Sequence, residues 1–328
     1  MRPPTSAPSE EAVVREAEGD LAWRLIAAAA LAAERLDHDN LPNAFAFDDG
    51  SRLRPVPHDD PAALVRWRPP VGWESVLPPA DPRRALIDLY LPICSATTAH
   101  PVTVGHLGQS LDGFIATHAG ESRWVTGPQN ILHLHRLRAL CDAVVVGAGT
   151  VAADEPQLTT RLVSGSNPLR VIIDPTRRLL EHHRVFNDES AETLYVCGAG
   201  LTRDGESHFG RATIVGLDDG KTGIDLQALM RLLRARGCSR VFVEGGGVTV
   251  SMFIEANLLD RLHVTIAPLI IGDGRPAIRL TPRDVLGDCH RPRYRVFRMG
   301  GDVLFDCDLS AEADGDPPTQ QFPVTRVI

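Results

Sequence analysis

From about residue 101 onward, short apolar runs alternate with segments of helical periodicity. This alternation predicts an α/β fold with a mostly parallel central sheet, because parallel strands are joined by crossovers that are usually helices. The expected strands are VTVGHLG, AVVVGAG, RVIID, TLYVCG, TIVGL, RVFVEG and HVTIAPLII. Flanking helices are expected at about 128–140, 224–236 and 248–258. A closing antiparallel hairpin is expected within YRVFRMGGDVLFDCDL, around Gly300 and Gly301.

The first 95 residues have a different texture. An alanine-rich helix is expected at about 20–36, followed by two short strands in AFAFDDGSRLRPV and a last helix in PRRALIDLYLPI. Both chain ends are polar and proline-rich, which is typical of loose termini. We therefore expect an N-terminal extension over 1–95, a main domain over 96–310 and a flexible tail over 311–328.

Composition excludes several classes of protein. The formal net charge is −8 and no run of five Lys or Arg occurs, which argues against nucleic acid as a partner. The longest apolar run, LIAAAALAA, is too short to cross a membrane, and acidic residues precede it where a signal peptide would be basic. Six cysteines stand singly, without spacing suited to zinc. We expect a cytoplasmic protein with reduced thiols and no metal.

Three consecutive glycines follow an apolar run in VFVEGGGVTV. A strand that ends at Gly245, Gly246 and Gly247 and leads into a helix presents backbone N–H groups at the positive end of the helix dipole. Such a turn is suited to an anion, most often phosphate, and Thr249 can add a hydroxyl. A tight strand-to-helix turn without a ligand is the alternative.

A second glycine-rich strand end occurs in AVVVGAGTVAADEPQLTTR. The strand ends near Gly147 and Gly149 and is followed by polar side chains, namely Thr150, Asp154, Thr159, Thr160 and Arg161. Neighbouring parallel strands open at the same carboxyl edge of a sheet, where α/β proteins bind ligands. Two such strand ends favour a ligand more than either alone, although Asp154 could simply cap a turn.

A polar loop, GESRWVTG, carries Trp124 between Ser122 and Thr126. An aromatic side chain in such a loop is suited to stacking on a flat ring, and packing within the domain is the alternative. For Arg170 and Asp174 in NPLRVIID, a structural role is expected. Thr176 and Arg177 follow just beyond that strand.

Five ordered blocks together resemble the riboflavin-biosynthesis reductases. They are SLDGFIATHAGESRWVTG, LRALCDAVVVGAGTVAADEPQLTTR, NPLRVIIDPTRR, VFVEGGG and APLIIGDGRP. The resemblance implies a dihydrofolate-reductase-like fold. It also implies an NADPH-dependent oxidoreductase that reduces the ribosyl group of 5-amino-6-(5-phosphoribosylamino)uracil to the ribityl form.

The resemblance also assigns roles to individual residues. It implies that the cofactor is contacted by Trp124, Thr150, Asp154, Gly245, Gly246, Gly247 and Thr249. With NADPH as the cofactor, Thr176 and Arg177 are candidate contacts for its 2′-phosphate. The resemblance implies that the substrate is contacted by Ser122, Arg138, Leu158, Arg161 and Glu244. Among these, Arg138 and Arg161 are the side chains suited to clamping a 5′-phosphate. Asp154 and Glu244 are the ionisable candidates for catalysis, since the hydride itself comes from the nicotinamide.

The chain departs from the family pattern at several places. His106 stands where the family often has lysine, and it could equally be a core or edge histidine. Glu155 replaces a second aspartate. Residues 1–95 contain neither H-x-E nor P-C-x-x-C, so no deaminase is expected there. That segment could support packing, a dimer or a lid. A homodimer is expected through the sheet edge near HVTIAPLIIGDG and the terminal hairpin.

Three rival activities follow from the same residues. A true dihydrofolate reductase needs a carboxylate on its first helix, and PQNILHLHRLRAL has none. A reductase of the diamino precursor, or of another flat heterocycle, fits equally well. A non-catalytic NADPH-binding relative is the third alternative.

Overall fold

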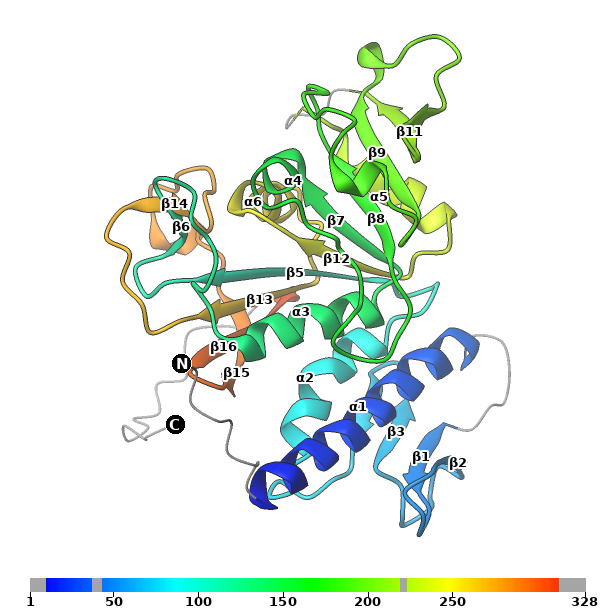
Figure 1. The fold of residues 1–328 in the computed structure, drawn as a ribbon. Coiled ribbons are helices and arrows are strands. Elements are labelled where there is room, and N and C mark those ends of the chain that lie inside the picture. Colours follow the sequence, from blue (N-terminus) through cyan, green and yellow to red (C-terminus); the bar gives the residue numbers. More distant parts are fainter. Residues whose placement is uncertain (1–9, 37–42, 219–222, 313–328) are drawn as a thin grey trace, which may run out of the picture. The chain divides into compact units, whose positions relative to one another are not determined.

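The computed structural model describes residues 10–36, 43–218 and 223–312. The chain divides into two compact units, Met1–Pro101 and Val102–Ile328 (Figure 1). None of the helices within the described ranges is long and apolar enough to cross a membrane. The tail expected at 311–328 lies almost entirely outside the described residues, as does the polar segment at the N-terminus.

The first unit combines two helices with a four-stranded antiparallel sheet in the order β2-β1-β3-β4. Its elements are α1 (Glu10–Leu36), β1 (Ala44–Phe47), β2 (Leu53–Val56), β3 (Val65–Arg68), β4 (Gly72–Ser75) and α2 (Arg84–Cys94). The helices meet edge-on through Trp23 and Tyr90, whose ring centres lie 6.0 Å apart. Helix α1 begins at Glu10, earlier than the start near residue 20 that the sequence predicted. The β3–β4 hairpin was not predicted, because Pro69 and Pro70 occupy its turn and resemble a break.

The second unit is built on a ten-stranded sheet in the order β10-β11-β9-β8-β7-β12-β5-β13-β16-β15. Its strands are β5 (Val102–Gln109), β7 (Ala143–Gly147), β8 (Leu169–Ile173), β9 (Thr193–Gly198), β10 (His208–Phe209), β11 (Ala212–Leu217), β12 (Arg240–Glu244), β13 (Arg261–Ile266), β15 (Pro292–Met299) and β16 (Asp302–Glu312). The strands from β11 to β13 in this order pair in parallel, whereas β10, β16 and β15 pair antiparallel. The mostly parallel sheet and the closing hairpin are confirmed.

Short elements and helices complete this unit. The helices are α3 (Pro128–Leu140), α4 (Ala148–Asp154), α5 (Leu226–Ala235) and α6 (Gly247–Glu255), with 3₁₀ turns η1 (Arg184–Phe186), η2 (Ala199–Leu201) and η3 (Leu286–Asp288). A separate two-stranded sheet pairs β6 (Phe114–Thr117) with β14 (Gly274–Pro276). All three predicted helices are present; α4 and the β6–β14 pair were not predicted, since each is too short to show periodicity.

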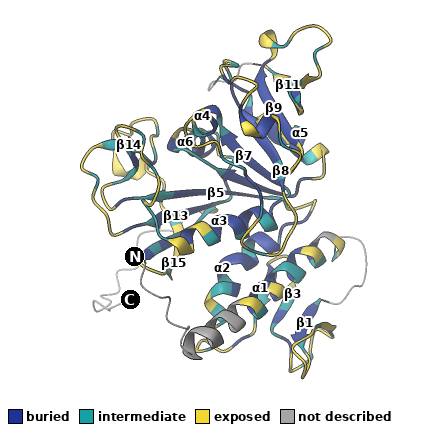
Figure 2. Ribbon diagram, viewed as in Figure 1, coloured by how far each residue is buried: buried dark blue, intermediate teal, exposed yellow. Residues whose placement is uncertain are grey.

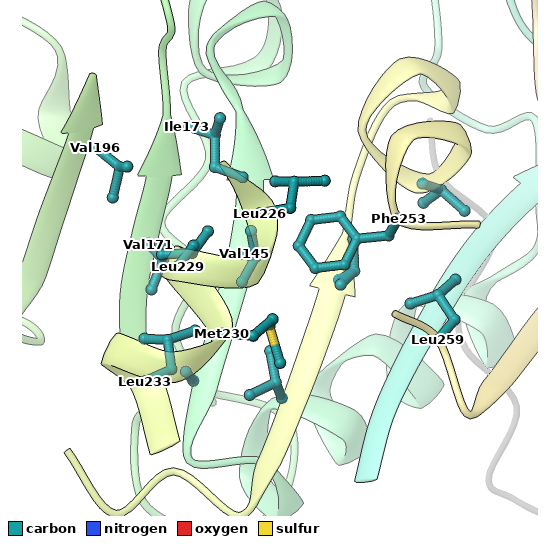
Figure 3. Packing of buried hydrophobic residues seen from close by; sticks show 14 of the residues in the cluster. Val145, Val171, Ile173, Val196, Leu226, Leu229, Met230, Leu233, Phe253 and Leu259 are labelled. Atoms are coloured by element: carbon teal, nitrogen blue, oxygen red, sulfur yellow. The ribbon is translucent and has the colours of Figure 1, made fainter. Parts of the chain in front are cut away.

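The main core lies between the sheet and helices α5 and α6. Figure 3 shows Leu229 and Met230 of α5 against Val145 and Val171 of the central strands, with Phe253 of α6 beside them. The central strands are buried on both faces (Figure 2), because α3 covers the opposite face. All six cysteines are free thiols, and four of them are buried.

Candidate active site

The two glycine-rich strand ends lie side by side at the carboxyl edge of the sheet, as the sequence predicted. Strands β7 and β12 are parallel neighbours. The N–H of Gly246 donates to Thr150 Oγ1 at 3.2 Å. A Cβ at Gly147 would lie only 2.4 Å from Thr249 Oγ1. The two turns that open α4 and α6 therefore form one continuous surface.

The three glycines at the start of α6 differ in what surrounds them. A Cβ at Gly247 would lie 1.8 Å from the carbonyl oxygen of Ala277 and 2.6 Å from that of Pro276. At Gly245 and Gly246 the nearest atom would be 3.6 and 3.5 Å away, which is ordinary contact. Close backbone packing thus explains Gly247. It does not explain the other two, which lie in the turn that precedes α6.

Arg138 of α3 and Glu244 at the end of β12 form a buried bidentate ion pair. The Arg138 Nε donates to Glu244 Oε2 at 2.7 Å, and Nη2 pairs with Oε1. The third nitrogen, Nη1, donates to the carbonyl oxygen of Thr159 at 3.2 Å. Only 8% of the Arg138 side chain and 14% of the Glu244 side chain are exposed. The pair holds the Glu244 carboxylate in place at the sheet edge.

Arg161 lies beside this pair with donors to spare. Its Nη1 donates to Thr159 Oγ1 at 2.6 Å, and its backbone N–H donates to His135 Nδ1 at 3.0 Å. Its remaining side-chain donors meet no hydrogen-bond acceptor among the described residues. Burial and the neighbouring Arg138 and Arg184 lower the pKa of Arg161. Crowding of like charges at a partly exposed position favours an anionic ligand.

His135 belongs to the same group and stays neutral. Burial, followed by Arg138 and Arg161, lowers the pKa of His135 to about 4. The positive charge of the group is therefore carried by guanidinium groups alone. We call the group formed by Arg138, Glu244, Thr159, Arg161 and His135 the arginine–glutamate cluster.

The loop around Trp124 reaches α4. Ser122 Oγ donates to Asp154 Oδ1 at 3.3 Å. Trp124 has a backbone φ of +71° and is 82% exposed, so the alternative that it packs within its domain is wrong. A left-handed conformation in a bulky exposed residue is costly and is typical of functional loops. Leu158 is also left-handed, with φ +56°, but it is fully buried, which leaves only its backbone available to a ligand.

A pocket of about 560 Å³ opens beside helix α4. Its walls are formed by Gly149, Ala152, Ala153, Arg178, Leu179, Leu180, His183 and Arg275. Arg178 makes no ion pair within the part of the chain that the structure describes, and sequence reasoning did not select it.

The two residues that the sequence predicted as 2′-phosphate contacts, Thr176 and Arg177, have different surroundings. Arg177 is bound through both terminal nitrogens to Glu206, so its charge is already matched. Thr176 is exposed but does not line the pocket. The sequence offers no signal that separates the adjacent Arg177 and Arg178, because the difference depends on Glu206, which lies far along the chain.

His106 lies in the core rather than in the site. Its Nε2 is 2.9 Å from Asn130 Oδ1 and 3.3 Å from Thr265 Oγ1. Burial, and then His263, lowers the pKa of His106 to about 3. The core interpretation is confirmed, and the residue supplies no positive charge.

His106 is one end of a buried polar group under α3. His133 Nε2 lies 3.1 Å from His263 Nδ1, and His263 Nε2 lies 3.2 Å from Asp306 Oδ1. Asp306 is fully buried and is paired with Arg261 and Arg295. We call the group formed by His106, Asn130, His133, His263 and Asp306 the histidine–aspartate cluster.

The structural role expected for Arg170 and Asp174 is also confirmed, since both are completely buried. Arg170 donates to Thr193 Oγ1 and to Asp188 Oδ1, at 2.8 and 2.7 Å. Asp174 accepts from Tyr195 Oη at 2.7 Å. Asp174 follows the last residue of β8 and also accepts from the backbone N–H of Leu179 at 2.8 Å, so it fixes the loop that leaves this strand.

Known proteins resemble this chain over the second unit. Residues 102–292 match the RibD C-terminal domain family. The chain is 32% identical over 212 residues to a 2,5-diamino-6-ribosylamino-4(3H)-pyrimidinone 5′-phosphate reductase of Methanothermobacter thermautotrophicus, covering 63% of this chain and 97% of that protein. It is 29% identical over 209 residues to the riboflavin biosynthesis protein RibD of Aquifex aeolicus, of which it spans 58%.

A solved structure agrees with these matches. The diaminohydroxyphosphoribosylaminopyrimidine deaminase/5-amino-6-(5-phosphoribosylamino)uracil reductase of Thermotoga maritima superposes with a TM-score of 0.54 at 27% identity, over 69% of this chain and 60% of that one. The dihydrofolate-reductase-like fold expected from the sequence is therefore confirmed. The family match covers more than half of the chain, and the chain belongs to the RibD C-terminal domain family.

Proposed function

We propose that the chain is the NADPH-dependent reductase of riboflavin biosynthesis. Its substrate would be 5-amino-6-(5-phosphoribosylamino)uracil, whose ribosyl group it reduces to the ribityl form. The observation that carries this proposal is the arginine–glutamate cluster beside two adjoining glycine turns at the carboxyl edge of the sheet. A phosphorylated substrate and a phosphate-bearing cofactor each need one of these two features.

On the substrate side, Arg161 is the clamp for the 5′-phosphate, because it is the arginine of the cluster with open donors. Arg138 acts through Glu244, which it orients. A carboxylate oxygen has more than one lone pair, so Glu244 can still accept from sugar hydroxyls. Ser122 and the backbone at Leu158 complete this side.

On the cofactor side, the turn at Gly245 and Gly246 is the proposed site for the pyrophosphate of NADPH, together with Thr150, whose hydroxyl oxygen accepts from the Gly246 N–H. Trp124 is free to stack on a flat ring. Arg178 replaces Arg177 as the candidate for the 2′-phosphate, because it lines the pocket. The cofactor side also keeps five residues predicted from the sequence, namely Thr150, Asp154, Thr176, Gly247 and Thr249.

The reaction itself asks little of the protein. Bound NADPH supplies the hydride, and the chain's residues bind, orient and exclude water. Asp154 and Glu244 are the candidates for moving the accompanying proton. Asp154 is held by Ser122, and Glu244 by Arg138.

Further assignments belong to the same proposal. The reductase domain spans 96–310, and 1–95 is an accessory segment. The protein acts in the cytoplasm as a homodimer. Strand β15 supports the homodimer, because it lies at the edge of the sheet and carries the exposed Tyr294. Light scattering at assay concentration tests the homodimer, and a monomer would contradict it.

The deciding experiment follows NADPH oxidation by the purified chain. The deaminated phosphoribosylaminouracil and its diamino precursor are supplied in separate assays, and dihydrofolate serves as the third. Turnover of the first is expected. Turnover of the diamino compound alone would move the assignment to the alternative substrate. NADPH binding without turnover of any of the three would leave a non-catalytic relative.

A further inference from the structure

We propose that Glu155, His182 and His183 form a binding site for one Zn²⁺ ion. Each of these residues offers one ligand atom, and the three atoms lie within 4.8 Å of one another. Over the described residues this is the one group of three or more such side chains placed so closely. Neither the fold nor the proposed reduction needs a metal, so the site is an addition to both.

The carboxylate is already held in position for a ligand role. Glu155 follows α4 in a left-handed conformation, with φ +45°. Its Oε2 accepts from the backbone N–H of Arg184 at 3.1 Å, and its Oε1 contacts His183 Nδ1. A backbone hydrogen bond of this kind orients a ligating carboxylate as outer-shell partners do in metal sites.

The first histidine is equally well fixed. His183 immediately precedes η1, and only 11% of its side chain is exposed. Its ring packs edge-on against Phe186 at 6.5 Å between centres. Two of the three donors are therefore ordered before any ion binds, which reduces the entropy lost on binding.

The second histidine supplies the donor that is still free. His182 is exposed, its ring centre lies 4.6 Å from that of His183, and it makes no hydrogen bond among the described residues. Donors around tetrahedral zinc at about 2.0–2.2 Å lie roughly 3.3 Å apart. Closing the set therefore requires the exposed His182 side chain to turn inward, and the Glu155 Oε1–His183 Nδ1 contact, which is shorter than this spacing, to open around the ion.

The donor types fit zinc. Two imidazoles and one carboxylate suit zinc, whereas Mg²⁺ and Ca²⁺ prefer all-oxygen sites. Three protein ligands leave a fourth position for water or an anion. His183 also lines the pocket beside Arg178, so a bound dication adds positive charge to that wall. The site could not be found from the sequence, because the glutamate lies far from the two histidines along the chain.

The test is a zinc titration of the full-length, tag-free protein after removal of metal by a chelator, with a chromogenic chelator as competitor. One saturable Zn²⁺ per chain is expected. His182→Ala and Glu155→Gln should each weaken the affinity at least about tenfold. The matched control is His118→Ala, which removes an exposed histidine 3.4 Å from Asp273 that has no third donor.

The result separates a metal site from a simple hydrogen-bonded pair. No saturable binding would overturn the proposal, as would unchanged affinity in the His182→Ala, Glu155→Gln double variant. An equal loss in His118→Ala would show that zinc binds exposed histidines in general. Circular dichroism checks folding; if Glu155→Gln misfolds, the exposed His182 variant decides alone. The readout is binding, so the outcome does not depend on the reductase assignment.

Discussion

Helix α3 contributes to two buried polar clusters that balance their charge in opposite ways. In the histidine–aspartate cluster the histidines are neutral, and the one acid is matched by two arginines. In the arginine–glutamate cluster a single carboxylate faces the guanidinium of Arg138, with Arg161 and Arg184 close by. The first cluster is closed within the protein. The second has positive charge left over at its exposed side, which is the property of a binding site.

The largest effect is expected from breaking the closed cluster. Asp306→Asn leaves Arg261 and Arg295 without their shared carboxylate, and it should lower the free energy of unfolding by about 3–5 kcal/mol. Urea titration measures this change. The control is Asp308→Asn on the same strand, where the carboxylate is 24% exposed. A large loss of kcat in folded Asp306→Asn protein would contradict a purely structural role.

The open cluster should respond in binding rather than in stability. Arg161→Ala removes the proposed phosphate clamp, so the substrate KM should rise about 10–100-fold while the NADPH KM stays nearly unchanged. Steady-state kinetics with each component varied measure both values. Arg184→Ala, which removes another exposed cation nearby, should cause a smaller rise. Equal effects of Arg161→Ala on both KM values would remove this arginine from the substrate.

Acid should destabilise the protein through the neutral histidines of the closed cluster, and in the same direction through His135 of the open one. Burial holds the pKa of His106 and His133 below the ordinary 6.5, to about 3 for His106. As pH falls through 6.5, the unfolded chain binds protons that the folded chain does not. Stability is therefore complete above that pH and is lost below it, by about 2 kcal/mol per such histidine at pH ~5. Thermal melts across this range measure the loss. His106→Gln should flatten the slope, and an unchanged slope would contradict the assignment.

The smallest effect is expected on the KM for NADPH, and it distinguishes Arg178 from the adjacent Arg177. Arg178→Ala should raise the KM for NADPH about tenfold and leave that for NADH unchanged, because only NADPH carries the 2′-phosphate. Arg177→Ala should instead lower stability by freeing Glu206. If Arg177→Ala alone changes the NADPH KM, the pocket assignment of Arg178 is wrong.

The sequence predicted the parts of the site that depend on local pattern. Strand, glycine and helix follow one another in the chain, so the two turns and their meeting at one sheet edge were foreseen. Long-range pairing was not foreseen. Arg138 and Glu244 were each selected, but nothing local indicated that they bind each other. His133 and His263 were not selected, because histidines distant in sequence give no periodic signal.

Gly245, Gly246 and Gly247 are the same residue type, but their packing differs. Because the obstacle at Gly247 is the main chain of Pro276 and Ala277, no change of a neighbouring side chain can make room for a larger residue there. Relief would require the backbone of 276–277 to move, and Arg275 of the pocket wall would move with it. The turn that opens α6 and the strand that borders the pocket are therefore coupled: suppressors of Gly247→Ala should be changes that shift the backbone of 276–277, and not substitutions that merely shorten a neighbouring side chain.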